Sequence, residues 1–187
     1  MSDDGRFFVD RKPPFSIADF ASVAPGVAAT TLWPVGASSP TILPANYWIP
    51  GRCLRITAGL KWTSGTAGNI TIGASYGAAS NPACIVNSAA KAAVASVGPF
   101  FVTVQAFFEC RSVGTSGTLS MWGCAWFPIA LMLSTTEINM TFPSAGTTVV
   151  STIDTTVGTN APMIHAIRSA GTDAVVVTNL IMESVGL

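Results

Sequence analysis

The chain has 187 residues, which is enough for one domain with its own hydrophobic core. Nine Lys and Arg balance nine Asp and Glu, and charged residues make up 10% of the chain, against about 25% in an average domain. This composition excludes a nucleic-acid-binding protein that relies on a basic surface, and the 49% of hydrophobic residues excludes a disordered chain.

Neither a membrane-spanning helix nor a secretory signal is predicted. The longest apolar stretch, residues 122–133, is interrupted by Gly123 and Pro128, whereas a spanning helix needs about 18 consecutive apolar residues. The chain opens with Asp3 and Asp4, and no apolar signal segment follows them. We therefore expect the protein to be synthesised in a cytoplasm.

Residues 1–26 are predicted to form an extended N-terminal arm. Residues 1–12 carry six of the eighteen charged side chains, and Pro13 and Pro14 then prevent a continuous helix. The aromatic side chains of this segment are suited either to anchoring the arm in another protein or to laying it over its own domain, and both alternatives stay open. The candidate contact residues of the arm are Phe7, Phe8, Arg11, Lys12, Phe15 and Phe20.

Residues 27–187 are predicted to form one all-β domain, because apolar residues alternate with polar ones between frequent turns. Residues 54–62 form the first clear strand of this kind. A turn at 64–68 leads to a second strand, whose inward side chains are Ile70, Ile72, Ala74 and Tyr76.

A second hairpin is predicted from residues 102–111 and 119–127, joined by a turn at 113–117. Its apolar positions include Val104, Phe108 and Met121. Three large aromatic residues fall instead on the outward side of these strands, and exposed aromatic surface is typical of contact sites. The alternative is that a loop or the N-terminal arm covers this aromatic face. The candidate subunit-interface residues are Phe107, Trp122 and Trp126.

Further strands are predicted at residues 147–153, 162–168 and 174–185, while the Ala-rich segment 87–97 is a candidate for a helix or a short turn. About eight strands in one domain of this length predict a jelly-roll-like antiparallel β-sandwich. An immunoglobulin-like sandwich is the alternative, although the Cys…Trp…Cys spacing of that fold is missing.

Few residues are suited to catalysis or to metal binding. The four cysteines (Cys53, Cys84, Cys110 and Cys124) have no CxxC spacing, and their positions predict free thiols. His165 is the only histidine, it lies in a predicted strand, and no Gly-x-Ser-x-Gly motif is present. The carboxylates are scattered singly. We therefore expect neither an enzyme nor a cofactor.

Several short segments together resemble a family of small virion proteins of tailed bacteriophages, in particular phages of actinobacteria. The resemblance spans about residues 30–185. The segments that carry it are Thr31-Leu32-Trp33-Pro34, Leu43–Trp48, Gly51–Gly59, Arg111–Thr118, Asp154-Thr155-Thr156 and Leu180–Ser184.

This resemblance implies a homotrimeric jelly roll that decorates the outer surface of the capsid and binds the major capsid protein. No active site is carried over from that family, and we expect no cofactor and no nucleic-acid, membrane or small-molecule partner. The low charge of the chain independently favours self-association, because a soluble monomer normally carries many more surface charges.

A carbohydrate-binding module of a tail fibre is the alternative function. Aromatic rings that stack on sugars would then form its binding site. The candidates for that role are Trp33, Tyr47, Trp48, Trp62, Trp122 and Trp126.

Overall fold

The computed structural model describes residues 19–33, 41–78, 81–132, 139–144, 149–170 and 172–185, and it contains eleven strands and one short 3-10 helix in these ranges. No helix in them is long and apolar enough to cross a bilayer. The elements are β1 (Thr30–Thr31), β2 (Cys53–Ser64), β3 (Gly68–Ala78), β4 (Asn81–Asn87), β5 (Lys91–Ala93), β6 (Val97–Ser112), β7 (Gly117–Trp126), η2 (Ile129–Leu131), β8 (Asn139–Phe142), β9 (Val149–Ile153), β10 (Ala161–Arg168) and β11 (Ala174–Val185).

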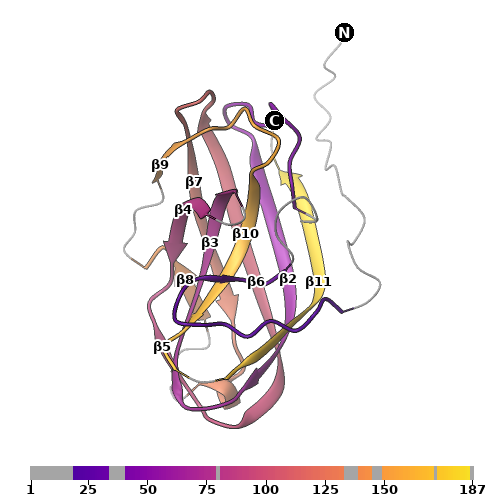
Figure 1. Ribbon diagram of the computed structural model, residues 1–187, viewed down its shortest axis with the longest axis vertical. Helices are drawn as coiled ribbons and strands as arrows, with labels where there is room; N and C mark the ends of the chain where they lie inside the picture. Colours follow the sequence, from indigo (N-terminus) through magenta and orange to yellow (C-terminus); the bar gives the residue numbers. More distant parts are fainter. Residues whose placement is uncertain are drawn as a thin grey trace.

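The strands form two antiparallel sheets that pack face to face (Figure 1). Sheet A has the order β11-β2-β6-β7-β8, with β9 also paired to β7, and sheet B has the order β1-β10-β3-β4, with β5 also paired to β3. The chain crosses between the sheets at β1–β2, β2–β3, β5–β6, β9–β10 and β10–β11. Strand β2 pairs with the distant β11 in sheet A, and its neighbour β3 pairs with β10 in sheet B. The pairs β2–β11 and β3–β10 are therefore nested, and the predicted jelly-roll-like antiparallel sandwich is confirmed.

The core lies between the two sheets and follows the predicted alternation. In β2, Leu54, Ile56 and Leu60 are buried, whereas Arg55, Thr57 and Lys61 between them are partly exposed. The predicted inward residues of β3 and of the β6–β7 hairpin are buried in the same way. Each fully buried Leu or Ile contributes about 1.5–3 kcal/mol of hydrophobic stabilisation, so this alternation determines which face of each strand turns inward.

The expected helix or turn at residues 87–97 is wrong. Asn87 ends β4, and Lys91–Ala93 form β5, which pairs with Gly68–Ile70 of β3. A helix of this length is marginal by itself because nucleation is costly, and the edge of β3 offers backbone hydrogen bonds instead. Strands β4 and β8 were not expected either.

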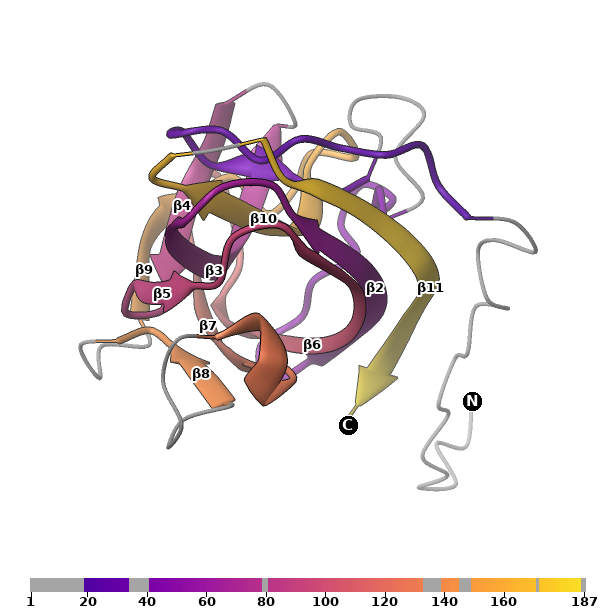
Figure 2. The same cartoon turned by 90° about the horizontal axis from the view of Figure 1, so that it is seen from below.

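The segment 19–31, here called the strap, joins the edges of both sheets. The backbone N–H of Phe20 donates to Val177 O at 2.9 Å, and Val23 exchanges two hydrogen bonds with Val175, both in β11 of sheet A. Further along, β1 of the strap pairs with β10 of sheet B. Figure 2 shows the strap running outside β11 and β10. The described part of the expected arm, residues 19–26, thus lies on its own domain.

Candidate functional site

The outer face of sheet A carries the aromatic residues that the sequence placed on the outward side. Phe107 of β6 lies directly opposite Trp122 of β7, and Trp126 lies opposite Thr103. Trp126 is 38% exposed, and Phe101, further along the same face of β6, is 72% exposed. We call Phe101, Phe107, Trp122 and Trp126 the aromatic stripe.

Sequence reasoning missed Phe101, because the predicted strand began at Val102. The signal was nevertheless present. Counting back from Phe107 in steps of two gives Gln105, Thr103 and Phe101 on the same face. The strand continues to Val97, so Phe101 belongs to the outer face as the others do.

Phe107 and Trp122 stack on each other. Their ring centroids are 5.5 Å apart and their planes differ by 7°. A cross-strand aromatic pair of this kind contributes about 0.5–1 kcal/mol beyond its buried area. Because each ring covers part of one face of the other, the pair offers less flat ring surface to a ligand than two separate rings would.

Three ion pairs lie around the stripe, and each joins two residues of this chain. Nε of Arg55 donates to Glu183 Oε2 at 2.9 Å, between β2 and β11. Arg111 Nη2 lies 3.2 Å from Glu109 Oε2, at one end of β6, and Lys61 Nζ lies 3.0 Å from Asp19 Oδ2, where the strap begins. The stripe is therefore bordered by charges that are already neutralised.

The three cysteines whose side chains are described, Cys53, Cys110 and Cys124, are free, as predicted. Cys110 lies opposite Leu119 and Cys124 lies opposite Gln105, so these two thiols are far out of register. Burial raises the pKa of all three thiols. They are therefore protonated and weakly nucleophilic near neutral pH.

His165 is buried in β10, as expected of a histidine within a sheet, and its Nε2 lies 2.7 Å from Asn87 Oδ1. Gly73 of β3 lies between the two residues, and a Cβ there would come within 2.6 Å of both of these atoms. Burial lowers the pKa of His165 to about 4. The histidine is thus a neutral member of a structural hydrogen bond.

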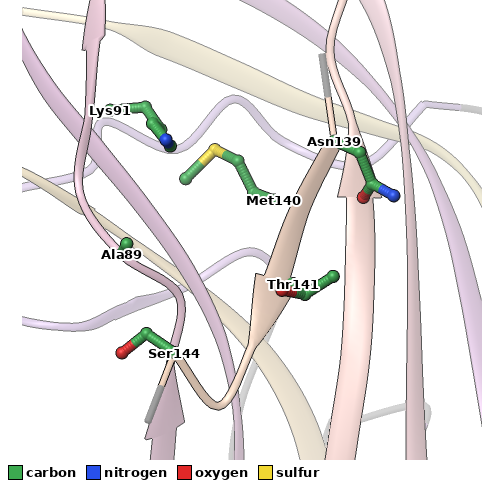
Figure 3. A pocket seen from close by; sticks show the side chains of 6 residues that line it. All are labelled: Ala89, Lys91, Asn139, Met140, Thr141 and Ser144. Carbon is green, nitrogen blue, oxygen red and sulfur yellow. The ribbon is translucent and has the colours of Figure 1, made fainter. Parts of the chain in front are cut away.

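The described residues contain no group of three or more His, Cys, Asp or Glu side chains arranged to hold a metal ion. A cavity of about 290 Å³ lies between β8 and the segment that joins β4 to β5. Figure 3 shows Met140 extending toward Lys91, while Asn139 and Thr141 point to the other side of β8. The polar groups of this cavity do not converge on a common point.

Three of the tryptophans considered for sugar binding are core residues. Trp33, Trp48 and Trp62 are 3% exposed or less. Trp48 Nε1 donates to Tyr76 Oη at 2.7 Å. Tyr47, the sixth candidate for sugar binding, is also in contact with its own chain, since Arg52 lies over its ring, 4.7 Å from the centroid. Only Trp122 and Trp126 of the five tryptophans lie on the outer face of a sheet.

Of the six candidate arm residues, Phe20 is the only one within the described ranges. Its side chain is partly buried and packs against the core of its own sandwich. Phe7, Phe8, Arg11, Lys12 and Phe15 lie outside the described residues.

No protein-family model, curated protein or solved structure matches this chain.

Proposed function

We propose that the chain is a structural protein of a bacteriophage virion, which decorates the outer surface of the capsid as a homotrimer and stabilises the head. The observation that carries the proposal is the aromatic stripe, which is exposed on the outer face of sheet A. The charged side chains around it are paired with each other, and the chain as a whole is poor in charge. Exposed aromatic surface of this kind is typical of protein–protein contacts. The sequence resemblance to phage virion proteins points in the same direction.

In this proposal each trimer sits where several subunits of the major capsid protein meet. A trimer holds three arms, and each arm makes a separate contact. Because linked contacts add through their effective concentration, a set of weak contacts suffices for stable attachment. The decoration then resists the separation of the capsid subunits that it joins.

The arm is the proposed capsid-binding element, through Phe7, Phe8, Arg11, Lys12 and Phe15. Phe20 has a different role in this proposal. Because its ring packs on the core and its N–H bonds to Val177, it fixes the point from which the arm leaves the domain. A fixed origin limits the entropy lost when the arm binds.

The first test is to separate phage heads from tails and to quantify the chain in each by mass spectrometry. Hundreds of copies per head are expected, since a decoration protein follows the repeat of the lattice. A few copies per tail would contradict the proposal. That result would favour the carbohydrate-binding alternative, for which Trp126 has the most exposed ring of the tryptophans.

A chain that lacks residues 1–15 tests the role of the arm. It keeps Phe20 and Val23, so the sandwich should remain folded, while its binding to undecorated heads should fall at least tenfold. Co-sedimentation with the heads measures the binding, and circular dichroism controls for folding. Undiminished binding would show that the arm is not the capsid contact.

A further inference from the structure

We infer that the aromatic stripe is the surface through which copies of this chain contact one another. The inference deepens the proposed function, since it names the contact that would hold the proposed trimer together. Its test uses the purified chain alone, so its outcome is independent of where the protein sits in a phage.

The stripe lies at the centre of sheet A. In the order β11-β2-β6-β7-β8, the strands β6 and β7 are flanked on both sides, and all four aromatic residues belong to these two strands. The ion pairs of Arg55 with Glu183 and of Lys61 with Asp19 lie toward β11. An apolar centre within a polar border is the usual anatomy of a protein–protein interface.

The charges around the stripe favour an uncharged partner. Arg55, Lys61 and Arg111 are each paired with a carboxylate of the same chain, so none is left for a charged partner to neutralise. A strongly acidic or basic partner would have to leave its own charges unpaired against this face, which is costly.

A second copy of the chain meets this requirement. Its net charge is zero, and its own border is neutralised by the same internal pairs. Around a threefold axis, the stripes of three copies can converge without burying an unpaired charge on any of them. Sheet faces with alternating side chains also pack closely against another protein surface, as the two sheets of this sandwich do.

A sugar is a poorer occupant of the stripe. Sugar binding relies on free ring faces, and Phe107 and Trp122 already cover part of each other at a centroid distance of 5.5 Å. Asp and Glu side chains that would bind sugar hydroxyls are engaged too, since Glu109 and Glu183 pair with Arg111 and Arg55.

The distribution of tryptophans provides a direct measurement. Trp33, Trp48 and Trp62 are buried, so an aqueous quencher such as iodide or acrylamide should reach mainly Trp126 and Trp122. If copies associate through the stripe, the quenchable fraction of the fluorescence should fall as the protein concentration rises. Sedimentation velocity on the same samples should show the oligomer forming over the same range.

The variant Phe101→Ser/Trp126→Ser should weaken association at least tenfold, because large aromatic residues dominate such contacts. Both side chains are exposed, so the fold should tolerate the change. The matched control is Ile49→Ser/Val113→Ser, which removes two other exposed apolar side chains (44% and 49% exposed) that lie outside the stripe. The control should associate as the unmodified chain does.

Two results would overturn the inference. One is an unmodified chain that stays monomeric up to millimolar concentration, and the other is an oligomer in which iodide quenches Trp126 and Trp122 as in the monomer. The second measurement needs no variant, so it decides the matter even if the double variant fails to fold. The two tests can also give different answers. If the oligomer protects its tryptophans but the protein is found on tails, this inference holds and the proposed function is wrong.

Discussion

At the scale of single residues, the ion pair between Arg168 and Asp173 is enclosed within the protein. Arg168 Nε lies 2.8 Å from Asp173 Oδ2, and neither side chain reaches solvent. Trp62 Nε1 and the backbone N–H of Gly65 also donate to the carboxylate, at 2.7 and 3.0 Å. The pair therefore ties the β2–β3 turn to the β10–β11 turn.

Replacing Asp173 by Asn should destabilise the fold by about 3–5 kcal/mol, because the buried guanidinium of Arg168 would lose its counter-ion. Urea unfolding followed by fluorescence measures the loss. Asp19→Asn is the matched control, since its ion pair with Lys61 is exposed and should contribute less than about 1 kcal/mol. Equal effects of the two changes would contradict the structural role assigned to Asp173.

His165 predicts how stability depends on pH. Its pKa in the folded protein is lowered to about 4 by burial, from 6.5 for an ordinary histidine. As the pH falls from 6.5 toward 4, the unfolded chain binds a proton that the folded chain does not bind. The free energy of unfolding should therefore decrease over this range, by up to about 3 kcal/mol.

The variant His165→Gln removes this titration and keeps a side chain that can hydrogen bond to Asn87. Unfolding curves of both proteins between pH 7 and pH 4 give the comparison. The stability of the variant should fall less steeply with decreasing pH. Parallel pH profiles would mean that other groups cause the acid sensitivity.

At the scale of elements, the strap protects an edge of sheet A. The backbone N–H of Val175 donates to Val23 O at 2.8 Å, so removal of the strap would leave this amide of β11 unpaired. Unpaired strand edges exchange their amide hydrogens quickly and tend to pair with other chains.

A chain without residues 1–25 should lose the protection of the Val175 amide and roughly 2–4 kcal/mol of stability. The loss reflects three backbone hydrogen bonds, at about 1 kcal/mol each, and the partial burial of Phe20. Hydrogen exchange measures the protection. The chain without residues 1–15 keeps the strap and is the control, in which Val175 should stay protected. Retained protection in the shorter chain would mean that the strap does not pair in solution.

At the scale of the whole molecule, the sequence predicted the strands better than their arrangement. Strands such as β2 and β6 bury one face, and the alternation of Leu54, Ile56 and Leu60 with polar residues makes that visible. The pairing of β2 with β11 joins residues more than a hundred positions apart, and no local pattern encodes it. Short strands such as β8 contain too few residues for a periodic signal.

For the candidate site too, some features could be predicted from the sequence and others could not. Phe107, Trp122 and Trp126 were placed on the outer face by strand alternation alone. The ion pairs that border the aromatic stripe were not predictable, because residues such as Arg55 and Glu183 meet only through the pairing of two distant strands. Burial of Trp33 and Trp48 was not predictable either, since both lie in irregular segments where alternation gives no direction.

The double attachment of the strap has a mechanical consequence. A pull applied at residue 19 loads the hydrogen bonds of Phe20 and Val23 to β11 first, and reaches β1 on β10 only after these have yielded. The strap should therefore detach in two steps as the force rises, first from β11 and then from β10. Tension from outside would be dissipated at the edge of sheet A before it reaches the second sheet.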